Sequence, residues 1–531
     1  MYRLLGKSRY EAVYKSAKYI TDGHGYIRAR KLSDALLGNL KIEAVAKEIE
    51  EKRNKDSVVA YGVIPLSHKR TEDLRQRYGL LQKFLKESKQ FGALRQSSES
   101  KAVKLALDNL ARTAGYGDAT RLTWSMEAGF IKEVEEYLKP KEIEGITISI
   151  SVAGDVPQLM IESSGKTLQS IPARLKKNKY VEELKKVYKQ LKDQHVRGRE
   201  LLEKAMVESS YFTGDEIAGL KENPIIWHMF SRLVLVKDND TFGFPSEDCL
   251  GITSAKGETT LLSGEDRLRI AHPYDLFKGG VWSQYQSVLF DRRWKQPFKQ
   301  VFRELYVPTE EEKLKTWSLR YAGNQIILSR ALALLKKRQW MMDYELGLQK
   351  VCYHGNVVAS IEFLNDLFSP GDIEPPTLEK VQFYERKGFG EKKISDIDPI
   401  VFSELMRDLD LVVSVAYSGG VDPETSQSTI EMRRVIVEHT VSMFGLTNVS
   451  VAGNFANVKG KLGTYNIHLG SGVIHKVGGT QIAVLPIYSQ GRGKVFLPFL
   501  DEDPKTSEII SKVLLFAEDT KIKDPSILAQ I

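Results

Sequence analysis

The first 140 residues carry apolar side chains at intervals of three and four, which is the spacing of one face of an α-helix. The clearest set is Leu74, Tyr78, Leu81 and Leu85. A following helix is expected to end at Gly115, because glycine readily adopts the left-handed conformation that terminates helices. The pattern therefore predicts a helical region over residues 1–140.

Beyond this region the period changes to two. The apolar residues Ile146, Ile148, Ile150 and Val152 alternate with polar ones, which is typical of a half-buried strand. A turn and a returning strand at residues 159–161 complete a predicted hairpin. Helical spacing returns over residues 180–207 and again over residues 323–337. Together these patterns predict a mixed α/β middle region over residues 141–368.

Glycine is about twice as frequent near the C-terminus, with 12 in the 77 residues from 417 to 493 against 40 in all 531. Short β-rich runs lie between these glycines, which favours an antiparallel meander with tight turns. Asp503 and Pro504 predict the start of a last helix, since aspartate caps helices and proline fits their first turn. We therefore predict a glycine-rich antiparallel β domain with a closing helix over residues 377–531, in a multidomain α+β protein.

Composition narrows the class of protein. Hydrophobic residues make up 42% and charged residues 27%, which excludes a disordered chain, a fibrous repeat and a disulfide scaffold. Two cysteines favour a reducing compartment, so we expect a cytoplasmic protein. No apolar run is long enough for a membrane span, and no signal peptide is visible. Helical spacing begins almost at residue 1, so we expect the C-terminal part of a longer protein or a short member of a longer family.

The formal charge of +8 is unevenly distributed. Residues 1–100 hold 21 Lys and Arg against 12 Asp and Glu, and the remaining residues hold 56 against 57. Basic helices with interleaved tyrosines are compatible with binding to nucleic-acid phosphates. They are equally compatible with ordinary solvated helix faces. The candidate nucleic-acid contacts are Arg28, Arg30, Lys31, Arg53 and Lys55.

Three acidic residues follow one another in the segment FSELMRDLDLVVSV. Glu404 and Asp408 share a face if the segment is helical, whereas Asp408 and Asp410 share a face if a strand begins early. Clustered carboxylates could hold Mg²⁺ for phosphoryl chemistry, so Glu404 and Asp408 are candidate catalytic residues. The alternative is a helix end with salt bridges to Arg407. Motifs of known metal sites are missing, and no metal site is predicted.

A predicted strand ends at His468 and is followed by a turn of Gly470, Ser471 and Gly472. Backbone N–H groups of such a turn could bind an anion, with His468 as the acid, base or ligand contact. Ser471 and Arg492 could join it as ligand-binding residues. The alternative is a hairpin that needs its glycines for conformational reasons only.

A further candidate is the segment RLRIAHP, in which Arg267 and Arg269 would share a strand face beside His272. Paired arginines are suited to binding phosphate or carboxylate groups. Ion pairing with neighbouring acids is the alternative.

Several long segments resemble one known family. They are LLQKFLKESKQFGALRQSSESKAVKLALDNLARTAGYGDATRLTWSMEA, RLRIAHP, QPFKQVFRELY, VFSELMRDLDLVVSVA, GTYNIHLGSG and DEDPKTSEIISKVLLFAEDTKIKDPSI. The chain resembles the bacterial family of unknown function that includes the molybdate-metabolism-regulator-like (MolR) proteins. The resemblance implies an association with MoxR-type AAA+ ATPases and von Willebrand A proteins in a chaperone-like or stress-response assembly. It supplies neither catalytic residues nor a cofactor, and the Trp-Gly-Arg motif of some relatives is missing here.

Two functions remain open on the sequence. The leading hypothesis is a non-enzymatic binding or adaptor protein of a bacterial stress-response or AAA+ ATPase-associated system, whose basic helices could contact nucleic acid. The alternative is an enzyme or ligand-binding protein acting on a phosphorylated or nucleotide-like substrate through His468 and the clustered arginines. Convergence of these side chains in one place would favour the alternative, and separate positions would favour the adaptor.

Overall fold

The computed structural model describes residues 2–16, 19, 23–343, 347–352, 355–364, 375–388, 390–420, 426–478, 481–484 and 495–531. Its internal contacts divide the chain into two units. Unit 1 comprises Met1–Ser151 and Gln158–Gln194, and unit 2 comprises Val152–Pro157 and His195–Ile531. The model confirms a multidomain α+β protein with a helical N-terminal region and antiparallel sheets.

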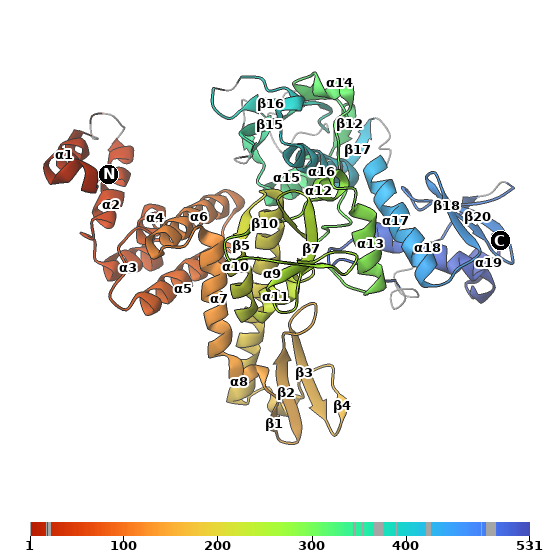
Figure 1. Cartoon of the computed structure of the whole chain (residues 1–531), viewed down its shortest axis with the longest axis horizontal. Coiled ribbons are helices and arrows are strands. Elements are labelled where there is room, and N and C mark those ends of the chain that lie inside the picture. Colours follow the sequence, from red (N-terminus) through yellow and green to blue (C-terminus); the bar gives the residue numbers. More distant parts are fainter. Residues whose placement is uncertain are drawn as a thin grey trace. The chain divides into compact units, whose positions relative to one another are not determined.

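Unit 1 begins with the predicted helical region (Figure 1). Its helices are α1 (Tyr2–Ser16), α2 (Gly23–Leu36), α3 (Ile42–Lys52), α4 (Lys55–Tyr61), α5 (Arg70–Ser88), α6 (Ala93–Ala114), α7 (Ala119–Glu133) and α8 (Glu135–Leu138). Leu74 and Leu81 of α5 are buried in its core, as their spacing predicts. Gly115 ends α6 with a left-handed φ of 88°, which confirms the predicted helix end.

A four-stranded antiparallel sheet completes unit 1, together with the first part of helix α9 (Lys179–Val207). The strands lie in the order β1 (Lys141–Ile143), β2 (Ile146–Ser151), β3 (Gln158–Ser163) and β4 (Lys166–Thr167). Ile148 of β2 pairs with Ile161 of β3, so the predicted hairpin is confirmed.

Unit 2 contains a six-stranded antiparallel sheet in the order β5-β10-β6-β7-β8-β9. These strands are β5 (Tyr211–Thr213), β6 (Leu235–Lys237), β7 (Thr241–Pro245), β8 (Gly251–Thr253), β9 (Thr259–Leu261) and β10 (Arg267–Ile270). The accompanying helices are α10 (Gly214–Gly219), α11 (Pro224–Phe230), α12 (Pro273–Lys278) and α13 (Trp282–Asp291).

A five-stranded sheet of order β11-β16-β15-β14-β13 follows. Its strands are β11 (Trp317–Ser318), β13 (Met341–Asp343), β14 (Gly347–Cys352), β15 (Val357–Phe363) and β16 (Leu378–Glu385). The neighbouring elements are α14 (Glu310–Lys313), α15 (Leu328–Lys337), α16 (Pro399–Ala416) and the strand pair β12 (Asn324–Ile326) and β17 (Tyr417–Gly420). The helix predicted over residues 323–337 is wrong at its start, because β12 is held in extended form by pairing with β17.

The C-terminal part of unit 2 is a five-stranded antiparallel meander in sequential order, which confirms the glycine-based prediction. Its strands are β18 (Val449–Ala452), β19 (Phe455–Lys459), β20 (Thr464–His468), β21 (Ile474–Lys476) and β22 (Gln481–Ile482). Helices α17 (Gln427–Met443) and α18 (Pro504–Ala517) pack against it, and α19 (Pro525–Leu528) follows. Asp503 accepts a hydrogen bond from the Thr506 N–H at 2.9 Å, as predicted for the cap of α18.

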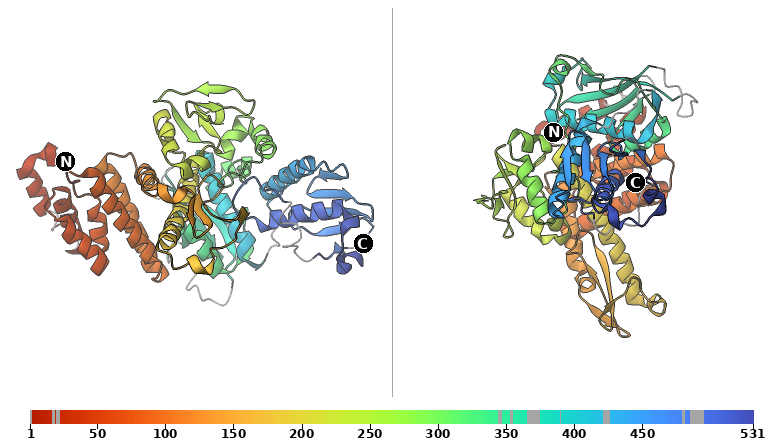
Figure 2. Two further views of the ribbon diagram at one scale, coloured as in Figure 1. Left: turned by 90° about the horizontal axis from the view of Figure 1, so that it is seen from below. Right: turned by 90° about the vertical axis from the view of Figure 1, so that its right-hand side faces the viewer.

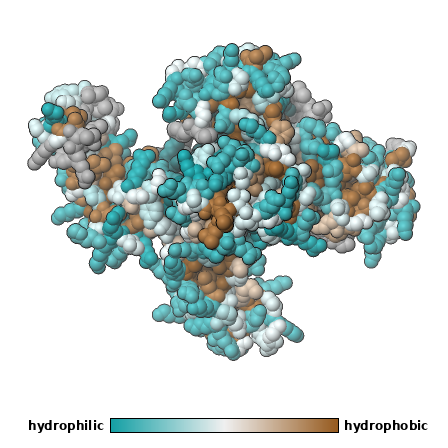
Figure 3. All heavy atoms as spheres, in the orientation of Figure 1, coloured by the Kyte–Doolittle hydropathy of each residue, from teal (hydrophilic) through white to brown (hydrophobic). Residues whose placement is uncertain are grey.

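Two further views show the same elements from other sides (Figure 2). On the face drawn in Figure 3, hydrophilic side chains predominate and hydrophobic ones form smaller patches. Among the helices of the described ranges, none combines the length and the apolar character that crossing a membrane requires.

Candidate functional site

Helix α16 carries the acidic residues proposed for catalysis. Glu404 is buried and accepts two hydrogen bonds from the Arg303 guanidinium, at 2.7 and 2.6 Å. His272 Nε2 lies 3.2 Å from the same carboxylate. Burial by itself would raise the pKa of Glu404, but Arg303 outweighs it and holds the pKa well below its usual range. Glu404 is therefore an ionised partner of a buried arginine.

Asp408 lies one turn further along α16 and has a different set of partners. Its two carboxylate oxygens are contacted by Arg338 at 2.8 Å, Lys350 at 2.6 Å and the Trp340 indole N–H at 2.9 Å. Although Glu404 and Asp408 share the helical spacing predicted for them, each is bound by its own donors.

Asp410 is placed differently from both, because the helix continues to Ala416 and no strand begins early. Its carboxylate accepts hydrogen bonds from the Tyr321 hydroxyl and the Thr429 hydroxyl, each at 3.4 Å. Burial raises the pKa of Asp410, against the hydrogen bond from Tyr306.

A buried ionic network around α16 includes residues that sequence reasoning did not assign to any site. Arg303 bonds Glu203 at 2.8 Å in addition to Glu404. The neighbouring Glu304 bonds Lys299 at 2.9 Å and Arg407 at 2.9 Å. Lys299 also reaches Asp503 at the cap of α18, at 2.8 Å. The network therefore joins α9, α16 and α18 inside unit 2.

The sequence does carry a signal for this network. In QPFKQVFRELY, the charged residues Lys299, Arg303 and Glu304 alternate with the aromatic residues Phe298 and Phe302. Both phenylalanines are fully buried. Charged residues at such positions avoid a large desolvation cost only when they are paired.

The arginines of RLRIAHP lie on β10 and have separate roles. Arg269 is buried and makes a bidentate ion pair with Asp275, with one of the two contacts at 2.7 Å. Burial would lower the pKa of Arg269, but Asp275 raises it. The guanidinium of Arg267 lies over the ring of Tyr211, 4.4 Å from its centre.

His272 caps the short helix α12. Its Nδ1 accepts a hydrogen bond from the Tyr274 N–H at 3.2 Å, and the side chain is fully buried. The opposite ring nitrogen faces Glu404, as described above. This histidine therefore connects α12 to the buried network.

The turn after β20 is held together by internal hydrogen bonds. His468 Nδ1 accepts from the Ser471 N–H at 3.1 Å, and the Gly472 N–H donates to the His468 carbonyl at 2.8 Å. Arg433 donates to the carbonyls of Leu469 and Gly470 at 3.2 and 2.8 Å. The N–H groups of residues 471 and 472 are thus used within the turn.

The electrostatics of this turn favour a neutral histidine. Burial lowers the pKa of His468, and Arg433 and His475 lower it further. His468 lies in the C-terminal meander, whereas Arg267 and Arg269 lie in the six-stranded sheet, and Figure 1 shows β20 and β10 well separated. Arg492, which we expected to join His468, lies outside the described residues.

The basic residues predicted to contact nucleic acid mostly form ion pairs within unit 1. The pairs are Arg28 with Asp56 at 2.8 Å, Arg30 with Asp34 at 4.0 Å, Lys31 with Glu48 at 2.6 Å, and Arg53 with Glu99 at 2.7 Å and Glu87 at 2.8 Å. Lys55 donates to the Ser98 hydroxyl at 2.6 Å. Arg53 is also covered by the ring of Phe84, 3.9 Å away.

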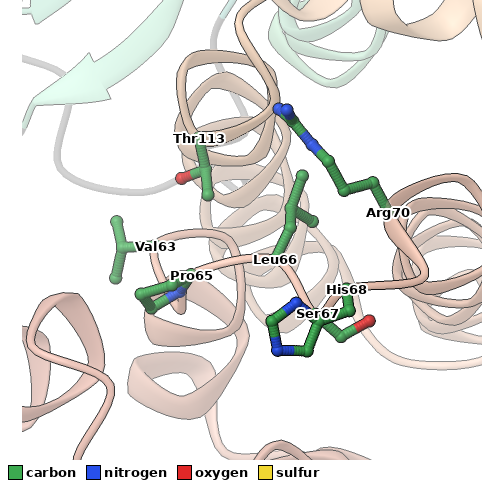
Figure 4. Close-up of a pocket in the computed structure, with 7 residues that line it drawn as sticks. All are labelled: Val63, Pro65, Leu66, Ser67, His68, Arg70 and Thr113. Atoms are coloured by element: carbon green, nitrogen blue, oxygen red, sulfur yellow. The ribbon is translucent and has the colours of Figure 1, made fainter.

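A hollow of about 490 Å³ lies at the connection between α4 and α5 in unit 1 (Figure 4). Its lining residues are Val63, Pro65, Leu66, Ser67, His68, Arg70 and Thr113. The lining thus combines an apolar part with hydroxyl, imidazole and guanidinium groups. Arg70 stands at the first residue of α5, and Thr113 reaches the hollow from α6.

The segment that lines the hollow is held by buried groups. Arg77 donates hydrogen bonds to the carbonyls of Tyr61, Ile64 and Pro65, at 3.3, 2.6 and 3.0 Å. Asp73 in turn accepts from Arg77 at 2.7 Å. A preformed site of this kind loses little conformational freedom when a ligand binds.

Within the part of the chain that the structure describes, no group of three or more His, Cys, Asp and Glu side chains is arranged to hold a metal ion.

Family models match three successive stretches of the chain. Three families of unknown function are represented. A family of unknown function (DUF5724) matches residues 1–126, a domain of unknown function (DUF4132) matches residues 165–340, and another (DUF7737) matches residues 430–531. No curated protein and no solved structure matches the chain. The hollow lies in the DUF5724 stretch, the β10 arginines in the DUF4132 stretch and His468 in the DUF7737 stretch.

Proposed function

We propose that the chain is a non-enzymatic binding or adaptor protein. The observation that carries this proposal is that the side chains expected to act in catalysis or ligand binding are each bound by separate partners. Glu404 is bound by Arg303, Asp408 by Arg338 and Lys350, and Arg269 by Asp275. A general acid or base must be able to reach the substrate atom to which it gives a proton or from which it takes one. Buried and fully paired groups serve structure better than proton transfer.

The partner that we propose is a MoxR-type AAA+ ATPase, with a von Willebrand A protein in the same bacterial stress-response assembly. The resemblance of the chain to the MolR-like proteins supports this choice. An adaptor of such a cytoplasmic system needs stable surfaces more than a reactive centre. The buried network of unit 2 supports that role, because it fixes helices from distant parts of the sequence.

We also propose that unit 1 contacts nucleic acid, and that the hollow beside α5 is the contact. Arg70 and His68 line it, and Lys69 lies between them with its side chain 83% exposed. Arginine and lysine neutralise phosphates, and apolar surface beside them can cover a base. The five basic residues expected from the sequence do not line the hollow. Four of them are paired with acids, and Lys69 also lies 3.6 Å from Glu72 but keeps most of its side chain exposed.

The adaptor proposal is tested with purified proteins. The full chain and the MoxR-type ATPase of the same genome are mixed and analysed by size-exclusion chromatography with light scattering, and ATP hydrolysis is measured in parallel. We expect a co-eluting complex and a changed hydrolysis rate. Separate elution together with an unchanged rate would reject the ATPase as the partner.

The nucleic-acid proposal is tested by fluorescence anisotropy with a labelled single-stranded oligonucleotide at several salt concentrations. We expect the affinity to fall with salt and to weaken in the Lys69→Ala and Arg70→Ala variants. Lys83→Ala is the matched control, because Lys83 also lies on α5 and pairs with Glu50 at 3.0 Å. An affinity that does not change with salt concentration, or that falls equally in the Lys83→Ala control, contradicts the proposal.

A further inference from the structure

We infer that unit 2 binds an oxyanion of the phosphate type at a basic cluster formed by Arg232, Lys295, His228 and His195 around Asp155. The cluster gathers residues from the turn at 152–157, from α9, from α11 and its C-terminal end, and from the segment after α13. This site is independent of the adaptor role and of the arginines on β10.

The charges in the cluster do not balance. The Asp155 carboxylate lies 2.6 Å from Arg232 Nη1 and 3.6 Å from Lys295 Nζ. Two permanent cations thus share one carboxylate, and only the arginine is within hydrogen-bond distance. Lys295 keeps 41% of its side chain exposed. A positive charge with free donor capacity therefore faces solvent beside Asp155.

Two histidines add nitrogen atoms without partners. His195 is only 7% exposed, and its Nε2 has no hydrogen-bond partner among the described residues. The Nε2 atom of His228 is likewise unpartnered, with Asp155 Oδ1 at 3.8 Å. A buried polar atom without a partner destabilises the folded chain, because it has lost its hydrogen bonds to water. A ligand that forms hydrogen bonds with these nitrogens would recover part of this loss.

The histidines also report the positive potential of the cluster. Burial lowers the pKa of His195, against the backbone of Asp155, and Arg199 lowers it further. Burial lowers the pKa of His228 too, and Arg232 adds to the effect. Both rings are therefore neutral near pH 7, so each carries one N–H and one acceptor nitrogen. The N–H of His195 faces the backbone of Asp155, which leaves its Nε2 free to accept a hydrogen bond.

This combination of donors selects the ligand. A guanidinium and an ammonium donate hydrogen bonds to the oxygens of a phosphate group, and a neutral imidazole nitrogen can accept one from the hydroxyl of a monohydrogen phosphate. Cations are disfavoured by the surplus positive charge. A carboxylate has the same kind of acceptor oxygens but only two of them, so phosphate can engage more of the donors.

The test is isothermal titration of the full chain with inorganic phosphate, with adenosine monophosphate and with acetate. We expect phosphate to bind more tightly than acetate, and Lys295→Gln to weaken phosphate binding about tenfold or more, as loss of a charged hydrogen bond does. Tighter binding of the nucleotide than of phosphate would identify a nucleotide as the source of the phosphate group.

The matched control is Lys237→Gln, which removes the same charge from the ion pair of Lys237 with Asp266 at 2.9 Å on β6. A second readout is the nitrogen resonances of His195 and His228, which we expect to shift when phosphate is added to the unmodified chain. The inference would be overturned if the titration with phosphate produced no heat of binding and the histidine resonances did not shift. So would an equal loss of binding in Lys237→Gln and Lys295→Gln.

Discussion

Replacement of Arg303 by methionine tests the buried network most directly. The Arg303 side chain is 1% exposed and donates two hydrogen bonds to Glu404 and one to Glu203. Methionine has a similar length but no charge, so the variant leaves the Glu404 carboxylate buried with His272 as its remaining close partner. The variant therefore removes the cation from the buried Glu404 carboxylate and from the partly exposed carboxylate of Glu203.

The expected loss is large. Breaking a buried ion pair by removing one partner costs about 3–5 kcal/mol of unfolding free energy, because an unpaired charge stays in a poorly solvated place. The control is Arg28→Met in the exposed pair of Arg28 and Asp56, whose side chains are 65% and 38% exposed. Solvent screens such a pair, so we expect the control to lose only about 0–1 kcal/mol of unfolding free energy.

The loss should also depend on pH with a definite sign. In the native chain the pKa of Glu404 is lower than in the unfolded chain. The ionised carboxylate therefore stabilises the fold fully at a pH above the unfolded pKa. This stabilisation is lost as the pH falls through the lower, folded pKa. Without Arg303, the pKa of Glu404 rises relative to the native chain, because burial is then opposed only by His272 and Arg407. The difference between the native chain and the variant is therefore greatest near neutral pH and narrows as the pH falls.

Hydrogen exchange followed by mass spectrometry is the suitable assay, because a chain of two units does not unfold in one step. The peptides that cover residues 296–306 and 399–416 report the network. We expect faster exchange in Arg303→Met at about pH 7 and a smaller difference at about pH 5, after correction for intrinsic rates. Exchange no faster than in Arg28→Met, or a difference that grows on acidification, would refute the reasoning.

Two other predictions concern packing and reactivity. A methyl group at Gly62 would lie 2.2 Å from the Ala106 carbonyl oxygen, so Gly62→Ala should destabilise unit 1 by about 1–3 kcal/mol. The added methyl group of Gly79→Ala in α5 meets open space, so this variant should be neutral or slightly stabilising. Hydrogen exchange of the α6 peptides measures the effect of both variants. Equal exchange rates in the two variants would contradict the packing argument. Burial raises the pKa of Cys352 to about 11, so alkylation at about pH 8 should be on the order of a hundredfold slower than in urea, and similar rates in a mass-spectrometric time course would disprove it.

Local features of the fold were predictable because each depends on neighbours in sequence. Gly115 ends α6 and Asp503 caps α18, as their residue types require. The alternation that starts at Ile146 identified β2, because the period of side chains along a strand is two. In contrast, β12 was missed, since three residues of extended chain have no distinctive spacing and depend on the pairing partner β17.

The sequence by itself determined the α+β class, the helical start, the meander and its closing helix. It left open whether Glu404, Asp408 and Asp410 lie on one helix or whether a strand begins before Asp410. It could not determine what those acids bind. Glu404 meets Arg303 across 101 positions, and Asp408 meets Lys350 across 58. Spacing reports which side chains share a face, but ion pairing depends on which faces of distant elements are buried together. Only the tertiary structure therefore decided that Glu404 belongs to the buried network around Arg303 and that Asp408 is bound by Arg338 and Lys350 instead.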